Sequence, residues 1–523
     1  MPLSIPRFLK KDALAMALFM LAMGSMCAFA MPPYGLFLLL VPGLSSLYWA
    51  LSRVTKPWHA FWLGYVFSLG FFTFGLYWIG NALLVDGNIY RWAWPLAVSG
   101  LPLGLSFFNA FACYALKRFV NLRSLNGLFA FTGALALSEW LRGNLFTGFP
   151  WNLFATTWGY TLEMVQIVCM ADIYLLSTLT IFWASCAGWL IITESSRINK
   201  AFVCTLVFLS IAGTYTYGYV RLRQNPIQLV KNQNIVVVQP DIKQSEKWKS
   251  DKILFNFQEI IKTSNPDDMK ENGIQNTTIV WPETSLSPFL LSRGWVHNMI
   301  ADMLQKYGEN ASLLTGALRY DPHNKTYHNS IINIGNNGDS LDFYDKNHLV
   351  PFGEYMPLKD ILDISPIVGF EGFAKGEGYT IKQTQQGLRY FPLICYEIIF
   401  PGTLPHDKKA PDIIINVSND AWYGMSAGPY QHYIQAVFRA VETGVPIARS
   451  ANTGISGIID GNGRTIKKIS LGVRGAISSP VPKKISIMNK NPYLIGLSYL
   501  LLWMFPFLMT FSVRIFSKYS RNN

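Results

Sequence analysis

Residues 234–240 read NIVVVQP, and from this point the pattern of the 523-residue chain changes. Isoleucine followed by three valines is a short β-branched run, typical of a strand covered on both faces. Similar runs follow at TTIVWPET (277–284), SLLTGALRY (312–320), HNSIINIG (328–335), LRYFPLICYE (388–397), DIIINVSNDAW (412–422) and TGISGIIDGNG (453–463). Helical patterns lie between some of them, at 247–264, 295–307 and 430–443. The alternation predicts an α/β domain in which helices cover a sheet.

The chain before residue 225 has a different composition. Apolar stretches lie at 13–30, 34–51, 58–85, 92–116, 125–141, 162–192 and 201–219, and one more at 492–516. Each is close to the ~20 residues that cross a hydrocarbon core of ~30 Å. Charged residues make up 14% of the chain, which is low for a soluble protein. We therefore predict a membrane α-helical bundle of about eight transmembrane helices, divided as a transmembrane domain (1–225), an external domain (226–490) and a C-terminal helix with a cytoplasmic tail (491–523).

Lysine and arginine are distributed unevenly between the connections of these stretches. With the N-terminus in the cytoplasm, thirteen lie in the inner connections and the tail, against two, Arg91 and Arg142, in the outer connections of the first seven spans. Positive residues concentrate on the cytoplasmic side, so the external domain should face away from the cytoplasm. The net charge of +13 comes largely from this cytoplasmic set. It favours a lipid bilayer as partner and argues against nucleic acid.

Cys395 is the only cysteine of the predicted external domain, because the other five lie within the predicted spans. A single cysteine forms no disulfide within its domain, so it is either a core residue or a reactive thiol. Two further ionisable residues lie where strands should end: Glu283 follows IVWP, and Lys346 lies in FYDKNHLVPFGEYMP. Functional groups gather at such positions in α/β sheets.

Four motifs resemble the nitrilase superfamily, whose members use a Glu-Lys-Cys triad on an αββα sandwich. They are WPETSLS (281–287), YDKNHLVPFGEYMP (344–357), CYEIIFP (395–401) and the segment 416–454, which begins NVSNDAWYG and ends ARSANTG. The preceding spans, SEWLRGNLFTGFPWN (138–152) and QSEKW (244–248) narrow the resemblance to the apolipoprotein N-acyltransferases, bacterial inner-membrane enzymes that complete lipoprotein maturation. The resemblance covers nearly the whole chain.

The resemblance implies a site and a reaction. The triad would be Glu283 as base, Lys346 as oxyanion stabiliser and Cys395 as nucleophile. The reaction would move the sn-1 acyl chain of a phospholipid, through a cysteine thioester, to the α-amino group of the N-terminal S-diacylglyceryl cysteine of an apolipoprotein. The implied location is the inner (cytoplasmic) membrane, multi-pass, with the catalytic domain in the periplasm, and we expect a monomer. Supporting or substrate-binding positions implied are Glu354, Glu397, Tyr396, Trp248 and Asn329.

These groups suit acyl transfer for physical reasons. A free thiol with a pKa near ~8.5 is mostly protonated at neutral pH. A carboxylate such as that of Glu283, accepting the proton as the new bond forms, removes that limit. An ammonium group aimed at the tetrahedral oxyanion stabilises it, which is the role expected of Lys346. A site at the membrane face also avoids moving acyl chains into water, at about 0.8 kcal/mol per CH₂ group.

Rival enzyme functions remain open from the sequence. A membrane-anchored nitrilase-type amidase that hydrolyses small C–N bonds would use the same triad. Gly424–Gly428 fits the serine hydrolase pattern G-x-S-x-G, although no strand should directly precede it. His348 or His432 could pair with Cys395 in a papain-like dyad. The histidines are dispersed without metal-ligand spacing, so we expect no metal and no cofactor.

Two further expectations concern the membrane part and one loop. A transporter with an external binding domain is a non-catalytic alternative. The spans argue against it, because they contain few ionisable residues, of which Asp172 and Glu139 are the notable ones. Because Glu139 and Arg142 are three residues apart on a helix, we expect them to pair. Segment 358–379 combines apolar residues with four glycines and is predicted to be a mobile lid.

Overall fold

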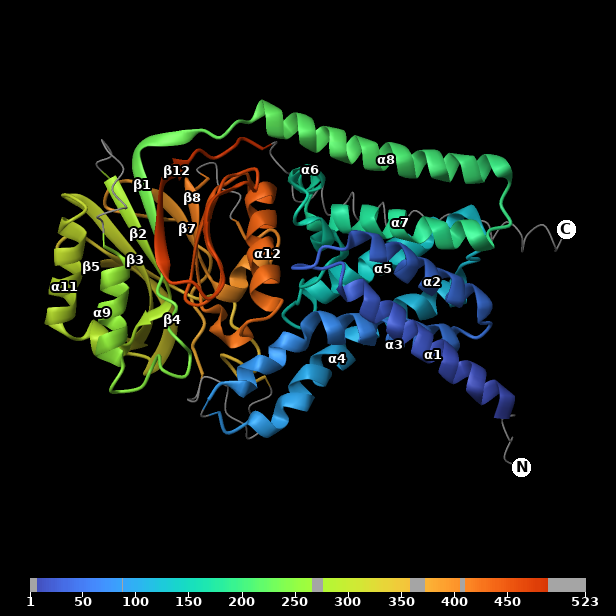
Figure 1. The fold of residues 1–523 in the computed structure, drawn as a ribbon, viewed down its shortest axis with the longest axis horizontal. Helices are drawn as coiled ribbons and strands as arrows, with labels where there is room; N and C mark the ends of the chain where they lie inside the picture. Colours follow the sequence, from blue (N-terminus) through green and yellow to red (C-terminus); the bar gives the residue numbers. More distant parts are fainter. Residues whose placement is uncertain (1–6, 87, 266–275, 358–371, 405–409, 488–523) are drawn as a thin grey trace. The chain divides into compact units, whose positions relative to one another are not determined.

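The computed structural model describes residues 7–86, 88–265, 276–357, 372–404 and 410–487 (Figure 1). Within them the chain forms two compact units, one built from residues up to 223 apart from a short stretch at 85–88, and the other mainly from 224–486. The predicted span 492–516 and residues 358–371 of the predicted lid lie outside the described residues. Residues 372–379 contain no helix or strand.

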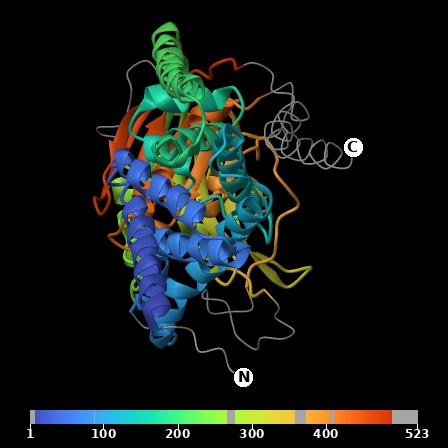
Figure 2. The same ribbon diagram turned by 90° about the vertical axis from the view of Figure 1, so that its right-hand side faces the viewer.

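The helices of the first unit follow the predicted apolar stretches. A helix satisfies its own backbone hydrogen bonds, as a bilayer requires. Figure 2 shows these helices after a quarter turn. They are α1 (Arg7–Ala28), η1 (Phe37–Leu39), α2 (Leu40–Arg53), α3 (Pro57–Leu76), η2 (Tyr77–Leu84), η3 (Arg91–Ala93), α4 (Trp94–Phe119), α5 (Leu125–Asn144), η4 (Phe154–Trp158), α6 (Leu162–Val165), η5 (Gln166–Cys169), α7 (Ile173–Ile192) and α8 (Arg197–Gln224). α3 packs against α1 and α4, and α7 packs against α2 and α5.

The stretch 162–192 is not the single helix that the prediction implies. It contains α6, η5 and, after a break, α7. The break lies at Asp172, which has an extended backbone and accepts a hydrogen bond from the Tyr174 amide at 2.7 Å. An aspartate in this position caps a new helix, so the chain restarts there.

In the part of the chain that the structure describes, four helical stretches are long and apolar enough to cross a membrane: Pro57–Leu84, Arg91–Phe119, Ile173–Ile192 and Arg197–Gln224. Two further apolar helices, Ala13–Ala28 and Phe37–Arg53, are shorter. The chain is thus a membrane protein by the length and composition of these helices. The full count of about eight spans stays a prediction.

Glu139 and Arg142 of α5 pair as expected, with Nη2 and Oε1 3.8 Å apart. Glu139 also accepts hydrogen bonds from the Phe154 amide at 2.9 Å and from the Ser177 hydroxyl at 2.5 Å. Arg142 donates to the carbonyl oxygens of Phe149 and Trp151, each at 2.7 Å. Both side chains therefore fix the loop after α5, which gives them a structural role.

The second unit contains two six-stranded sheets. The first has the order β12-β1-β2-β3-β4-β5 and the second β11-β10-β9-β8-β7-β6. In each, a parallel central trio (β1-β2-β3 and β7-β8-β9) is flanked by antiparallel strands. The bounds are β1 (Leu229–Gln239), β2 (Asn276–Leu286), β3 (Asn310–Asp321), β4 (Thr326–Ile334), β5 (Ser340–Asp345), β6 (Lys382–Gln383), β7 (Arg389–Ile394), β8 (Ile413–Ser418), β9 (Ile447–Ala451), β10 (Ser456–Ile459), β11 (Thr465–Ile469) and β12 (Gly475–Pro482).

Burial on both faces explains the apolar run at residues 235–238 of β1. Successive side chains of a strand point to opposite faces. Val236 and Val238 belong to the core beneath the helices of the first sheet. Ile235 and Val237 belong to the core between the two sheets. A strand buried on both faces needs apolar residues at every position, so the expectation from NIVVVQP is confirmed.

Helices cover the outer faces of both sheets and complete an αββα sandwich. In Figure 1, α9 and α11 lie on the first sheet, and α12 lies on the second. The helices of this unit are α9 (Ile253–Thr263), α10 (Pro288–Leu291), α11 (Gly294–Gln305), η7 (Cys395–Ile399), η8 (Asp420–Tyr423) and α12 (Gly428–Thr443). The predicted αββα class is thus correct for this unit.

Candidate active site

Glu283 lies on β2, where the strand leaves its regular pairing. The register of β2 against β3 shifts between Trp281 and Leu286, and Thr284 has a φ of +51°. Such a bulge re-aims the side chains on it. On β3, Gly316 lies so close to this bulge that a Cβ atom there would come within 2.5 Å of Glu283 Cα. A glycine on the neighbouring strand therefore makes room for the bulge that contains Glu283 and the strained Thr284.

Lys346 follows β5 directly and enters a group of buried polar side chains. Its Nζ lies 2.8 Å from Oε2 of Glu354 and 3.9 Å from Oε1 of Glu283. Asn329 on β4 donates from Nδ2 to Oε1 of Glu283 at 2.7 Å and to Oε1 of Glu354 at 3.0 Å. Glu354 also accepts the Val350 amide at 2.8 Å. One ammonium group and one amide thus connect two carboxylates in fixed positions.

Cys395 lies at the end of β7, in the second sheet, as the first residue of η7. It is 7% exposed and has a φ of +51°, a left-handed conformation that costs a non-glycine residue about 1–2 kcal/mol. Strain of this kind persists at functional sites because the surrounding structure holds it. The strained turn presents the thiol at the end of the strand.

Glu397 holds the main chain on both sides of the site. Its carboxylate accepts the amide of Ile394 at 2.8 Å, just before Cys395. It also accepts the amides of Asn347 at 2.8 Å and His348 at 2.9 Å, just after Lys346. Burial raises the pKa of Glu397 to about 7, partly offset by these amide donors. The side chain therefore ties the loop of the nucleophile to the loop of the lysine.

A second lysine, Lys247, is buried beside Glu283. Its Nζ donates to the carbonyl oxygen of Glu283 at 2.9 Å and to the Thr284 hydroxyl at 2.7 Å. Its Nζ also lies 5.7 Å from the ring centre of Trp248. Burial lowers the pKa of Lys247 to about 8, against the carboxylate of Glu283. This ammonium group thus braces the strained bulge that carries Glu283.

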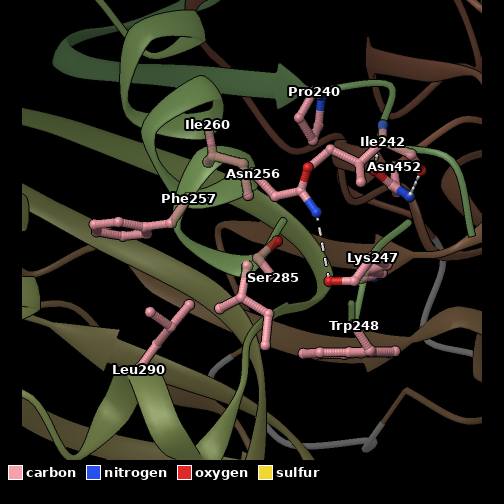
Figure 3. Close-up of a pocket in the computed structure, with 11 residues that line it drawn as sticks. Pro240, Ile242, Lys247, Trp248, Asn256, Phe257, Ile260, Ser285, Leu290 and Asn452 are labelled. Carbon is pink, nitrogen blue, oxygen red and sulfur yellow. Dashed lines mark hydrogen bonds between the residues drawn. The ribbon is translucent and has the colours of Figure 1, made fainter. Parts of the chain in front are cut away.

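Lys247 and Trp248 line a small, mostly apolar pocket beside α9 (Figure 3). Figure 3 shows the amide of Asn256 reaching the main-chain oxygen of Lys247, a distance of 3.5 Å. The tryptophan side chain is 37% exposed. The remaining lining residues are Pro240, Ile242, Ile253, Phe257, Ile260, Ser285, Leu290 and Asn452. Trp248 therefore stands at an apolar surface next to the bulge of Glu283.

Burial and the neighbouring charges shift the pKa values of Cys395, Glu283 and Lys346. Burial raises the pKa of the Cys395 thiol to about 12, and Glu283 adds to this while Lys346 opposes it. Burial also raises the pKa of Glu283, against the pull of Lys346. Burial alone would lower the pKa of Lys346, but the carboxylates of Glu354 and Glu283 outweigh it and raise that pKa. The resting site therefore holds a protonated thiol and a charged lysine.

The rival arrangements have different geometry. The His348 ring stacks on Phe400 with centres 4.0 Å apart, and burial lowers its pKa to about 4. The His432 ring nitrogen Nε2 lies 3.1 Å from the main-chain oxygen of Cys395. Ser426 donates to the Tyr423 carbonyl at 2.7 Å and accepts the amide of Gly428 at 3.1 Å, so it lies in the turn between η8 and α12 and does not end a strand. These contacts do not favour a papain-like dyad or a serine nucleophile.

The site gathers most of the residues predicted for it. Glu283, Lys346, Glu354 and Asn329 are joined directly, and Cys395 and Glu397 adjoin them across the two sheets. Tyr396 instead packs edge-on to Phe400, with ring centres 5.0 Å apart. Sequence reasoning did not single out Lys247, although it lies in QSEKW (244–248). A thiol, a carboxylate that can take its proton and a fixed ammonium group can together perform acyl transfer.

Comparisons with known proteins identify the family to which each part of the chain is similar. Residues 234–483 match the family model described as carbon-nitrogen hydrolase, which defines the class of the second unit. Residues 23–187 match the model described as apolipoprotein N-acyltransferase N-terminal domain. The apolipoprotein N-acyltransferase of Allorhizobium ampelinum is 36% identical over 480 residues, covering 88% of both chains. That of Agrobacterium fabrum is 36% identical over 501 residues, covering 90% of this chain and 91% of the other.

The chain belongs to the apolipoprotein N-acyltransferase family. The resemblance found in the sequence motifs is thereby confirmed. Among solved structures, that of Saccharomyces cerevisiae Nit3, a member of branch 10 of the nitrilase superfamily, is 18% identical, with a TM-score of 0.37. The matched region covers 52% of this chain and 94% of Nit3.

Proposed function

We propose that this chain moves the sn-1 acyl chain of a phospholipid, through a thioester on Cys395, to the α-amine of an apolipoprotein. The acceptor would be the N-terminal S-diacylglyceryl cysteine. The observation that carries the proposal is the placement of Glu283, Lys346 and the strained Cys395 in one buried site of a carbon-nitrogen hydrolase unit. Family membership and the apolar helices support a lipid substrate.

In the first half-reaction, the sulfur of Cys395 attacks the carbonyl carbon of the phospholipid ester. Glu283 accepts the thiol proton as the bond forms, because a thiol with a raised pKa does not ionise on its own. The ammonium group of Lys346 stabilises the tetrahedral oxyanion. When the intermediate collapses, the glycerol oxygen leaves with the proton from Glu283. The products are the thioester and a lysophospholipid.

In the second half-reaction, the neutral α-amine attacks the thioester. Glu283 takes the proton that the amine loses, and the thiolate of Cys395 leaves and is protonated again. The acyl chain ends in an amide, and the site returns to its resting state. A sequence of this kind gives ping-pong kinetics, since the first product leaves before the second substrate reacts.

The supporting residues have separate parts in this proposal. Glu354 and Asn329 position Lys346 and Glu283, because their hydrogen bonds join the two. Glu397 holds the two loops of the site together. Trp248 lines the neighbouring pocket and would contact substrate there. Tyr396 packs the turn after the nucleophile.

We propose the domain boundaries 1–225, 226–490 and 491–523, with about eight transmembrane helices and the catalytic domain in the periplasm. The excess of lysine and arginine in the inner connections supports this orientation. Alkaline phosphatase fused after residue 122 should be inactive, and the same enzyme fused after residue 486 should be active. The opposite pattern would reverse the topology. We also expect a monomer, which sedimentation in detergent would test.

The decisive experiment follows the acyl chain. The purified protein is incubated with a phospholipid whose sn-1 chain is isotope-labelled, and its intact mass and peptide map are measured. We expect a thioester on Cys395 that disappears when a diacylglyceryl-cysteinyl peptide is added, with the label moving to the peptide α-amine. Release of free fatty acid without transfer would favour a hydrolase of the amidase type. An unlabelled Cys395 in an active protein would refute the thioester.

A further inference from the structure

A group of buried charged side chains lies against the main chain of the nucleophile. It consists of Asp420 at the start of η8, His432 on α12 and Arg449 on β9, and each is at most 1% exposed. His432 Nε2 lies 3.1 Å from the carbonyl oxygen of Cys395. Its Nδ1 lies 2.9 Å from Asp420 Oδ1 and 3.0 Å from Arg449 Nη2. Arg449 Nη2 also donates to Asp420 Oδ2 at 2.8 Å.

The partners of the ring determine where its proton lies. A carbonyl oxygen can only accept a hydrogen bond, so Nε2 carries the proton and donates it to Cys395. Burial and the neighbouring Arg449 lower the pKa of His432, so the ring is neutral and Nδ1 accepts from Arg449. The positive charge of Arg449 outweighs burial and keeps the pKa of Asp420 below its usual range. The charges of Asp420 and Arg449 thus compensate each other around a neutral imidazole.

The same group reaches the strand that leads to the nucleophile. Arg449 is bonded to the side chain of Asn416 on β8, and Asn416 donates to the Leu393 carbonyl at 3.1 Å. Arg449 Nε also donates to the carbonyl of Ile455 at 3.2 Å. Two carbonyl groups of the nucleophile segment, those of Leu393 and Cys395, are therefore held from the second sheet and α12.

We propose that His432, fixed by Asp420 and Arg449, is a positioning residue that holds the strained main chain of Cys395. The positive φ of Cys395 is a conformation that a free chain leaves readily. A hydrogen bond to its carbonyl oxygen keeps the turn in place, so that the thiol stays aimed at the ester carbon. The expected effect of His432 on thioester formation rests on the proposed function. The expected effect of His432 on the reactivity of the Cys395 thiol does not rest on it.

The test compares His432→Phe, which keeps a ring but has no donor, with His432→Gln, which restores an N–H group. The matched control is His297→Phe on α11. The ring nitrogens of His297 also lie near carbonyl oxygens, Nδ1 at 2.8 Å from that of Gly338 and Nε2 at 2.9 Å from that of Leu291, but this residue lies outside the site. Two rates are measured on the full chain in detergent: thioester formation from labelled phospholipid, and alkylation of Cys395 by iodoacetamide as a function of pH.

For His432→Phe we expect both rates to fall by about 10–100-fold, as misplacement of a reacting group does. The KM for phospholipid and the pH midpoint of alkylation should stay unchanged. His432→Gln should recover most of the loss, and His297→Phe should react like the natural protein. If His432→Phe does not fold, Arg449→Lys replaces it, and both rates should then fall by a smaller factor.

Three results would overturn the proposal. Unchanged rates in His432→Phe would show that the hydrogen bond is not needed. A shifted pH midpoint, with no thioester in either His432 variant, would make the ring a catalytic base. Equal losses in His297→Phe would reduce the effect to general stability. If the natural protein forms no thioester, the proposed function fails, and the alkylation rates still decide the positioning role.

Discussion

The ammonium group of Lys346 lies 2.8 Å from Glu354 Oε2 and 3.9 Å from Glu283 Oε1. Its close partner is thus not the proposed base. Glu354 keeps the lysine charged and in place, while Glu283 remains able to take a proton from the thiol. The two carboxylates of the site therefore have different parts, although a single amide, that of Asn329, contacts both.

Glutamine substitutions should separate these parts. Glu283→Gln removes the base, so thioester formation should fall by at least the 10²–10⁴-fold typical of acid-base catalysis. Glu354→Gln keeps the base but loosens Lys346, and we expect a loss of about 10–100-fold. Single-turnover thioester formation measures both. A larger loss in Glu354→Gln than in Glu283→Gln would exchange the two roles.

The charge of Lys346 should matter for the oxyanion. In Lys346→Met we expect thioester formation to slow by about 10²–10³-fold, the loss typical of one oxyanion donor. Lys346→Arg should not rescue it, because the planar guanidinium cannot replace a compact ammonium group between two carboxylates. Lys484→Met, at an exposed lysine bonded to the Ala410 carbonyl, is the control and should have natural activity. Full activity in Lys346→Arg would contradict the geometric argument.

The pH dependence of thioester formation should report Glu283. Burial raises the pKa of this carboxyl, so the rate should rise with pH through a midpoint above the ordinary value of ~4.3. The positive charge of Lys247 pulls the pKa of Glu283 downward. Lys247→Met should therefore move the midpoint to higher pH. Lys252→Met, at a surface lysine beside Phe255, should leave it in place. A midpoint that stays or moves down in Lys247→Met would contradict this.

Glu397 should be important for stability as well as for the site. In Glu397→Gln, the amide NH₂ group faces backbone donors that need an acceptor, and a buried donor left unpaired costs about 1–3 kcal/mol. The midpoint of thermal unfolding should fall accordingly. Glu259→Gln, in the partly exposed pair with Arg474, should change stability by less than about 1 kcal/mol. Equal midpoints of thermal unfolding in Glu397→Gln and Glu259→Gln would show that the backbone amides around Glu397 find other acceptors.

Gly316 should be required for the position of Glu283. In Gly316→Ala, the new Cβ meets Pro282 and Glu283, so the bulge must shift. We expect thioester formation to slow by about 10²-fold, as a misplaced catalytic group does. Gly294→Ala on α11 meets nothing within 4 Å and should react at the natural rate. If both alanine variants react equally fast, the bulge tolerates the displacement.

The strands that could be predicted from the sequence are those buried on both faces. NIVVVQP and DIIINVSNDAW predicted β1 and β8 because each contains an unbroken run of β-branched residues, 235–238 and 413–415. β9 was missed, since its sequence IARSA carries Arg449 and Ser450 into the core. β11 was missed because TIKKI is mostly exposed. The turn at 460–463 joins the antiparallel pair β10 and β11.

The resemblance to family motifs predicted more of the candidate site residues than the positions of ionisable residues at strand ends did. Glu283, Lys346 and Cys395 stand out as ionisable residues at strand ends, and the structure joins Glu283 to Lys346. The sequence did not indicate that Lys247 belongs to the site, because a lysine in a polar segment is usually exposed at the surface. Its burial depends on the bulge of β2, which local sequence does not reveal. Long-range packing of this kind decides which polar residues become buried.

The pairing of β1 with β12 has a consequence for how the protein is made. β1 begins at Leu229 and β12 ends at Pro482, so the sheet that carries Glu283 is closed by a strand synthesised about 240 residues after its partner. At 5–20 residues per second, a ribosome needs roughly 10–50 s to make that interval. For this time one edge of β1 has no partner within its own sheet. The order of synthesis thus makes the base's half of the site the last to become complete.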